Sequence, residues 1–373
     1  MTTSALFKPL TLGSVSLTHR VIMAPLTRMR ATVPGAIPNA LNAEYYAQRA
    51  TPGGLIIAEA SQIVPGGRLA PSTPGIHSDE QMAGWSEVVK AIHSKGGKVF
   101  LQLWHVGRLS HSTYQPDGGA PVAPSAVPAS GKVRTNDGEL ADKQMPRALS
   151  LDEIAALIQD YAKAARNAKQ AGFDGVEVHA ANGYLLEQFL QSNSNQRTDE
   201  YGGSIQNRAR LTLEVSAAVS DVFGADRVGV RLSPFGVAND SGEADPEPLY
   251  RYLIRELDKM SLAYLHLIEP RASGAGQAEV DHQNVPSAAT LFRNDWRSVL
   301  IAAGNFRLDS AEQIIERGDA DAVAFGRLFI SNPDLPERLR AGHDLTPYNR
   351  ATFYTSGEEG YTDYPFIKPP LAS

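Results

Sequence analysis

The chain has 373 residues, of which 42% are hydrophobic and 20% charged, and its formal net charge is -6. It contains no cysteine, which excludes disulfides, thiolate nucleophiles, iron–sulfur clusters and cysteine–zinc sites and fits a cytoplasmic protein. The sequence has no basic block, no apolar run of about 18 residues and no apolar core of a signal peptide, so we expect neither a nucleic-acid partner nor a membrane.

Short apolar runs alternate with amphipathic helical stretches along the whole chain. Near-continuous apolar runs are expected of parallel strands that are covered on both faces. Such runs occupy residues 20–25, 54–60, 98–104, 175–180, 228–234, 263–270, 299–305 and 322–327. Eight strand-then-helix units predict an α/β fold, a (β/α)8 TIM barrel that forms one domain over residues 1–373. A doubly wound open sheet is the alternative, although no G-x-G-x-x-G follows the first run.

Several helical stretches begin with recognisable start signals. In a capping box, a serine and the Glu or Gln three residues later each accept a hydrogen bond from the other's backbone N–H. An asparagine followed by proline also suits a helix start, because proline is favoured at the first helical position. We therefore predict helix starts at residues 78–81, 150–153, 310–313 and 332–333.

Three segments are not needed for a minimal barrel. Residues 4–19 predict an N-terminal hairpin at the bottom of the barrel. Residues 106–149, which are rich in Pro, Gly and Ser, are inserted after the third strand, and residues 271–296 form a second insertion after the sixth. Long loops in compact domains usually form lids or binding sites, so we expect residues 106–149 to cap a site.

Polar and glycine residues gather where the predicted strands end. In TIM-barrel enzymes the chemistry lies at the carboxyl ends of the strands, which meet at one rim. The candidates there, in chain order, are Pro25, Leu26, Thr27, Ala60, Gln102, Trp104, His179, Asn182, Tyr184, Arg231, Gly304, Asn305, Gly326 and Arg327. The last four follow strands seven and eight, where backbone N–H groups often bind a phosphate, which could belong to a substrate or to a cofactor.

Each polar candidate also has a purely structural interpretation. A single histidine at a strand end, such as His179, is more often a hydrogen-bonded structural residue, but Asn182 and Tyr184 nearby favour a site. Gln102 either contacts a cofactor or belongs to a polar core network. Arg231 within a strand needs a buried anion or a cofactor oxygen. We expect no metal site, because the sequence offers too few suitable ligands together.

Longer motifs resemble the Old Yellow Enzyme family of FMN-dependent ene-reductases. The most specific is H-A-A-N-G-Y-L-L-E-Q-F-L at 179–190, followed by S-N-Q-R-T-D-E-Y-G-G-S-I-Q-N-R at 194–208. The resemblance extends through A-P-L-T-R-M-R, L-Q-L-W-H-V-G-R, A-F-G-R and F-Y-T-S-G-E-E-G-Y-T-D-Y-P, in order along nearly the whole chain. Thr27 stands where one subgroup of the family has cysteine, so the chain is similar to the threonine subgroup.

The resemblance implies a noncovalent FMN at the barrel mouth. Thr27 would contact flavin O4, Gln102 the pyrimidine edge, and Arg231 the N1 and O2 positions. The remaining cofactor contacts implied are a ring lining by Pro25, Leu26 and Ala60 and a phosphate site of Gly304, Asn305, Gly326 and Arg327.

The resemblance also implies a ping-pong reaction in which NADPH or NADH reduces the flavin and an activated alkene reoxidises it. His179 and Asn182 would hold the substrate's carbonyl or nitro oxygen, and Tyr184 would protonate the α-carbon. Trp104 and Tyr354 would line the substrate pocket. The implied substrates are enones, enals, maleimides and nitroalkenes, with nitrate esters and nitroaromatics as further candidates.

Some questions stay open at this stage. Ala70 stands where many relatives have an aromatic residue, so a more open pocket is expected on that side. A flavin-free, phosphate-binding isomerase or aldolase is the alternative enzyme, but it would need lysine or paired carboxylates at the strand ends. A flavin-binding stress protein without catalysis is the other alternative. Both a monomer and a homodimer are compatible with the sequence.

Overall fold

The computed structural model describes residues 4–270 and 285–367. Eight parallel strands close into a barrel, with the first strand paired to the last and each strand between its neighbours in sequence. They are β3 (Val21–Met23), β4 (Leu55–Gln62), β5 (Lys98–Trp104), β10 (Gly175–Ala180), β11 (Val228–Leu232), β12 (Tyr264–Ile268), β13 (Val299–Ala303) and β14 (Ala322–Phe325). The predicted (β/α)8 barrel is therefore confirmed.

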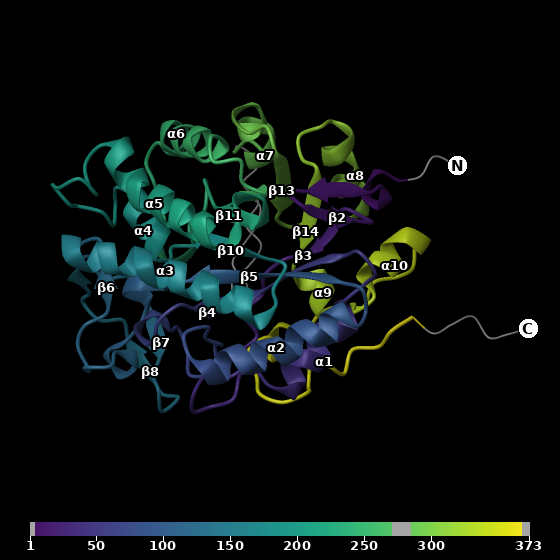
Figure 1. Ribbon diagram of the computed structural model, residues 1–373, viewed down its shortest axis with the longest axis horizontal. Helices are drawn as coiled ribbons and strands as arrows, with labels where there is room; N and C mark the ends of the chain where they lie inside the picture. Colours follow the sequence, from purple (N-terminus) through teal and green to yellow (C-terminus); the bar gives the residue numbers. More distant parts are fainter. Residues whose placement is uncertain (1–3, 271–284, 368–373) are drawn as a thin grey trace, which may run out of the picture.

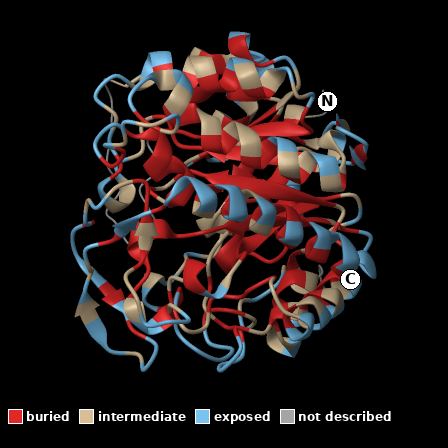
Figure 2. Cartoon of the chain, turned by 60° about the vertical axis from the view of Figure 1, so that its left-hand side comes forward, coloured by how far each residue is buried: buried red, intermediate tan, exposed pale blue. Residues whose placement is uncertain are grey.

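Helices surround the barrel and cover the outward faces of its strands (Figure 1). They are α1 (Ala40–Arg49), α2 (Asp79–His93), α3 (Leu151–Ala171), α4 (Leu185–Leu190), α5 (Ile205–Phe223), α6 (Pro246–Asp258), α7 (Ala288–Phe292), α8 (Leu308–Glu316), α9 (Arg327–Ser331) and α10 (Leu335–Ala341). Figure 2 shows buried strands inside and helices whose outer sides are exposed. Within residues 4–270 and 285–367, no helix has the length and apolar character needed to cross a membrane.

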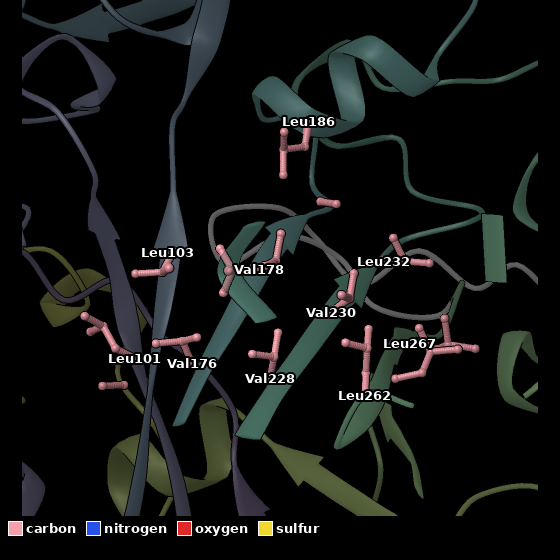
Figure 3. Packing of buried hydrophobic residues seen from close by; sticks show 14 of the residues in the cluster. Leu101, Leu103, Val176, Val178, Leu186, Val228, Val230, Leu232, Leu262 and Leu267 are labelled. Atoms are coloured by element: carbon pink, nitrogen blue, oxygen red, sulfur yellow. The ribbon is translucent and has the colours of Figure 1, made fainter. Parts of the chain in front are cut away.

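The layer between strands and helices is the main apolar core. Alternate residues of β5, β10, β11 and β12 carry branched aliphatic side chains, including Leu101, Val176, Val230 and Leu267 (Figure 3). These side chains are fully buried and belong to one cluster with the inner faces of the helices. The intervening residues of the same strands point into the barrel, because side chains alternate along a strand. This alternation decides which residues reach the site.

The bottom of the barrel is closed by the predicted N-terminal hairpin, β1 (Leu10–Leu12) and β2 (Val15–Leu17), which pair antiparallel. Its side chains Leu12, Val15 and Leu17 are buried with inward-facing strand residues such as Ile57 and Phe100 in a second apolar cluster. The lower half of the barrel is therefore filled by apolar side chains.

Two of the four predicted helix starts are confirmed and two are wrong. Capping boxes begin α2 at Ser78 and α3 at Ser150. Helix α8 begins two residues before Ser310, whose hydroxyl oxygen instead accepts a hydrogen bond from the backbone N–H of Arg307 at 2.9 Å. Helix α10 begins at Leu335, because the Asn332 side chain binds elsewhere: its Oδ1 accepts from the backbone N–H of Thr346 at 2.8 Å.

The insertion at 106–149 forms two small sheets beside the barrel, at the lower left of Figure 1. Strand β6 (Val122–Ala123) pairs with β9 (Arg147–Ala148), and β7 (Lys132–Arg134) pairs with β8 (Leu140–Asp142). None of its residues lines the large cavity described below. It instead holds the loop after β11, since Ser130 Oγ donates to the Asp240 carboxylate at 2.7 Å and Arg108 donates to the Asp240 carbonyl at 3.3 Å. Of the second insertion, residues 271–284 lie outside the described residues.

Candidate active site

A cavity of about 1000 Å³ opens at the carboxyl ends of the barrel strands. Its volume lies at the upper end of the range of roughly 300–1,000 Å³ for ligand pockets. Every predicted site residue lines it: Pro25, Leu26, Thr27, Ala60, Gln102, Trp104, His179, Asn182, Tyr184, Arg231, Gly304, Asn305, Gly326, Arg327 and Tyr354. The rim thus brings together residues from strands far apart in the sequence.

His179 is the last inward-facing residue of β10 and is 3% exposed. Burial, together with the positive charge of Arg231, lowers the pKa of His179 well below its ordinary value, so the imidazole is neutral. Its Nδ1 atom is buried and has no hydrogen-bond partner among the described residues, and the same holds for Nε1 of Trp104. Buried polar atoms are normally paired in folded proteins, so unpaired ones beside a cavity indicate a missing ligand.

Asn182 and Gly183 form a left-handed turn directly after β10. Their φ angles are 58° and 76°. The backbone N–H of Asn182 donates to Ser233 Oγ at 2.9 Å, and its carbonyl accepts from Asn239 Nδ2 at 2.9 Å. A side chain at position 183 would lie 2.6 Å from the carbonyl oxygen of Ala238. Glycine is therefore required there, and the tight turn aims Asn182 into the cavity.

Two residues that the sequence analysis left without a role hold this turn. The Glu187 carboxylate is buried and accepts from Ser233 Oγ at 2.6 Å and Ser241 Oγ at 2.9 Å, and also from the backbone N–H of Gly183. Burial raises its pKa above the ordinary value. The Gln188 amide donates to the Gly183 carbonyl at 2.8 Å. The letters E-Q in the long motif therefore have a positioning function.

Tyr184 ends the turn and precedes α4. Its ring stands edge-on to Trp104, with ring centres 4.7 Å apart, and to His179, with ring centres 5.0 Å apart. Burial raises the pKa of Tyr184 above its ordinary value, so the phenol keeps its proton at neutral pH. Trp104, His179 and Tyr184 thus form one aromatic cluster on one wall of the cavity.

Gln102 and Arg231 form the polar floor of the cavity. Gln102 Nε2 donates to Glu177 Oε1 at 2.7 Å. Arg231 is 9% exposed, and its Nε has no hydrogen-bond partner among residues 4–270 and 285–367. Glu177 was not identified from the sequence, although it precedes His179 by two residues and therefore shares its inward face.

The far end of the cavity is lined by the glycine-containing ends of β13 and β14. Gly304 and Asn305 have φ angles of 135° and 50°. Arg327 Nη2 lies 3.4 Å from Asn305 Oδ1, and its guanidinium lies over the ring of Tyr348 at 5.6 Å. A backbone in this conformation next to a guanidinium suits an anion such as a phosphate.

Two arginines of the motif A-P-L-T-R-M-R hold the segment that carries Tyr354. Arg28 is fully buried and donates to the carbonyl oxygens of Phe353 at 3.1 Å and Gly360 at 2.7 Å. Arg30 donates to the Thr352 carbonyl at 2.9 Å. Tyr354 is 43% exposed at the rim of the cavity. These contacts join positions more than 300 residues apart, which the sequence analysis could not find.

Ala70 is 2% exposed and does not line the cavity, whereas its neighbour Leu69 does. The Ala70 carbonyl accepts from Thr73 Oγ1 at 2.8 Å in a turn. The short alanine side chain therefore forms no part of the cavity wall. A pocket that is more open on this side than with an aromatic residue at position 70 stays a prediction.

Comparisons with known proteins agree with this geometry. The sequence pattern of the NADH:flavin oxidoreductase / NADH oxidase family matches residues 5–346. A putative 12-oxophytodienoate reductase 11 from Oryza sativa subsp. japonica is 45% identical and is covered over 98% of each chain. Flavin oxidoreductase hxnT from Emericella nidulans is also 45% identical, over 97% of this chain and 98% of that protein.

Among solved structures, morphinone reductase in complex with tetrahydroNAD superposes with a TM-score of 0.90. It is 50% identical and covers 99% of both chains. The chain therefore belongs to the NADH:flavin oxidoreductase / NADH oxidase family, the Old Yellow Enzyme family of the resemblance, and is an FMN-dependent oxidoreductase.

Proposed function

We propose that this protein reduces the C=C bond of activated alkenes, namely enones, enals, maleimides and nitroalkenes, with NADPH or NADH as the electron donor. Nitrate esters and nitroaromatics are further candidate substrates. Relatives named as reductases of 12-oxophytodienoate and of morphinone support a substrate with a carbonyl group. Bound FMN would supply the hydride-transfer chemistry that links the nicotinamide to the β-carbon of the alkene.

The residues on the cavity floor and at its far end fit FMN. The pyrimidine edge of a flavin offers an imide N–H and carbonyl oxygens, which complement the Gln102 carbonyl and the buried Arg231 guanidinium. Thr27 would contact O4, the flavin carbonyl oxygen next to the imide N–H. The contacts that we propose for the rest of the cofactor are a ring lining by Pro25, Leu26 and Ala60 and a phosphate site of Gly304, Asn305, Gly326 and Arg327.

The wall formed by the long motif suits the substrate. His179 and Asn182 would donate hydrogen bonds to the carbonyl or nitro oxygen, which gains negative charge as the β-carbon is reduced. Tyr184, held as a neutral phenol, would transfer the hydroxyl proton to the α-carbon. Trp104 and Tyr354 would line the pocket around the alkene.

One observation carries this proposal: a protonated phenol, a neutral imidazole and an amide form one wall of the same cavity whose floor holds a buried guanidinium. The family match supports a flavin enzyme over the flavin-free isomerase or aldolase. We further propose that the enzyme is cytoplasmic, acts on small molecules and is a monomer or a homodimer. The chain would form a single FMN-binding domain, with residues 106–149 at its side.

The test is a visible spectrum of the purified protein, followed by anaerobic addition of NADPH and then of cyclohexenone. We expect a flavin spectrum that bleaches with NADPH and recovers with the enone. Recovery with oxygen alone would contradict the alkene substrate, and a protein that cannot be reconstituted with FMN would contradict the whole proposal.

A variant separates the two half-reactions. Tyr184→Phe removes the proton donor and keeps the ring, so alkene reduction should slow by about 10²–10⁴-fold, the range for general acid catalysis. Flavin reduction by NADPH should stay nearly unchanged, because it needs no proton from this side chain. Equal losses in both half-reactions would refute the assigned role of Tyr184.

A further inference from the structure

A buried carboxylate lies directly beneath the cavity floor. Glu177 is 0% exposed and does not line the cavity. Its Oε1 accepts from Gln102 Nε2 at 2.7 Å, and its Oε2 accepts from Tyr264 OH at 3.0 Å and from His266 Nδ1 at 2.8 Å. Three donors on three sides therefore satisfy this carboxylate, and only Gln102 among them also faces the cavity.

The register of the barrel strands brings these residues together. Glu177 of β10 lies opposite Gln102 of β5 on one side and Gly229 of β11 on the other. A side chain at position 229 would lie 2.1 Å from the ring of Tyr264. Glycine at this position therefore leaves room for the Tyr264 phenol to reach across β11 to Glu177. Arg231, two residues further along β11, lies opposite His266.

The carboxylate fixes the orientation of the Gln102 amide. An ionised carboxylate only accepts hydrogen bonds, so the NH₂ group of Gln102 must point towards Glu177. The carbonyl Oε1 of Gln102 is then the atom left for the cavity. The floor consequently offers a carbonyl acceptor, which matches an imide N–H of a ligand.

Glu177 also sets the charge of the floor. Burial alone would raise the pKa of Glu177, but the hydrogen bonds from His266 and Gln102 and the charge of Arg231 lower it below its ordinary value. Burial lowers the pKa of His266, so this imidazole is neutral and donates from Nδ1. Glu177 therefore supplies the negative charge that partly offsets the buried Arg231 guanidinium.

We propose that Glu177 is a positioning residue for the flavin, which orients Gln102 as the acceptor of the flavin imide N–H and tempers the charge of Arg231. The inference rests on the proposed placement of the FMN pyrimidine edge over Gln102 and Arg231. It has two separable consequences. The site prefers a flavin with a free N3–H, and the flavin has a lower reduction potential than it would have beside an uncompensated arginine.

Three variants separate charge, orientation and general stability. Glu177→Gln keeps the shape and removes the charge. Glu177→Asp keeps the charge but shortens the side chain by one methylene, which takes the carboxylate out of reach of Gln102. Tyr264→Phe is the matched control, because it removes one hydrogen bond from the same carboxylate at the same depth and changes neither the charge nor the Gln102 contact.

The first measurement is the reduction potential of the FMN-loaded full-length chain. We expect a positive shift in Glu177→Gln, because the reduced, negatively charged flavin is stabilised when the nearby carboxylate charge is lost. Glu177→Asp and Tyr264→Phe should stay close to the wild type. A potential of Glu177→Gln equal to that of Tyr264→Phe would overturn the charge role.

The second measurement is the ratio of the Kd values for 3-methyl-FMN and FMN, with the full-length chain freed of its flavin. The wild type should have a Kd for FMN that is lower than that for 3-methyl-FMN by a factor of about ten or more. This is the loss of affinity expected when the buried acceptor Oε1 of Gln102 has no donor. In Glu177→Asp the ratio should fall several-fold, whereas Tyr264→Phe should keep it. An unchanged ratio in Glu177→Asp would overturn the orientation role, even if Glu177→Gln fails to fold. A wild type that binds both flavins equally would overturn the placement of FMN, and this inference with it.

Discussion

Gly183→Ala tests whether the turn after β10 positions Asn182 and Tyr184 for their proposed roles. Gly183 has a φ of 76°, where an alanine costs roughly 1–2 kcal/mol relative to glycine. Its new Cβ would lie 2.6 Å from the Ala238 carbonyl oxygen and 2.8 Å from Asn239 Cβ. Such overpacking adds about 1–3 kcal/mol. The free energy of unfolding should therefore fall by about 2–5 kcal/mol.

The same clash should reach the chemistry. Asn239 donates to the Asn182 carbonyl at 2.9 Å, and both residues line the cavity. Relief of the clash must move either the turn or the loop after β11, so Asn182 and Tyr184 should lose their alignment. A misplacement of about 1 Å can cost roughly 10²-fold in rate. We expect a loss of this size in alkene reduction, measured by anaerobic stopped-flow reoxidation of the flavin.

Gly203→Ala is the matched control. Gly203 has a nearly identical φ of 79°, but a Cβ there would meet no atom within 4 Å. This variant should lose only the conformational part, roughly 1–2 kcal/mol, and should keep its activity. Both variants are compared by urea unfolding and by stopped-flow. Equal losses of stability in the two variants, or full activity in Gly183→Ala, would refute the reasoning.

Three further predictions concern other parts of the site. His179→Ala should weaken the binding of phenols by about tenfold or more, since one hydrogen bond to the phenolate oxygen is lost. Binding is measured by the change in flavin absorbance when the phenol is added. Unchanged affinity would contradict the oxygen-binding role. Arg28→Lys cannot reproduce both hydrogen bonds to the carbonyls of Phe353 and Gly360, so the free energy of unfolding should fall by about 2–4 kcal/mol. Limited proteolysis should then begin in the C-terminal segment. Cleavage elsewhere first would show that Arg28 does not hold this segment. Burial raises the pKa of Glu59 from 4.5 to about 7, so the unfolded chain releases this proton first and the free energy of unfolding should fall as pH rises from 4.5 to 7. Glu59→Gln should remove this fall, which is at most about 3 kcal/mol by urea unfolding. An identical pH dependence in the variant would refute the argument.

The composition of the rim could be predicted from the sequence because of the barrel topology. The carboxyl ends of all parallel strands meet at one rim, so residues such as Gln102 and Arg231 had to converge once eight strands were recognised. The exact strand pairing was not needed for this conclusion. Every predicted strand-end residue accordingly lines the cavity, and Tyr354, which the resemblance implied, lines it from the C-terminal segment.

The residues behind the cavity lining, such as Glu177 and Tyr264, could not be predicted in the same way. The contact of Tyr264 with Glu177 crosses β11 and depends on the glycine at position 229 and on the register of three strands. Likewise, the helix starts expected at 310–313 and 332–333 depended on local signals that the fold uses otherwise. Asn332 is a good N-cap residue, but its side chain binds the backbone of Thr346, a contact that no local pattern reports.

The polarity of the barrel interior changes within one step along β5. On β5 the inward residue Phe100 belongs to the apolar cluster closed by the hairpin, and the next inward residue, Gln102, faces the cavity. Buried charged groups seldom stabilise a protein more than well-packed apolar side chains would, so stability alone does not explain why Glu177 and Arg231 lie inside the barrel near the cavity. A ligand with a polar edge does explain it, because the ligand provides the partner that Nε of Arg231 lacks among the described residues. On β5, the boundary between the apolar interior that stabilises the fold and the part that lines the cavity therefore lies between Phe100 and Gln102.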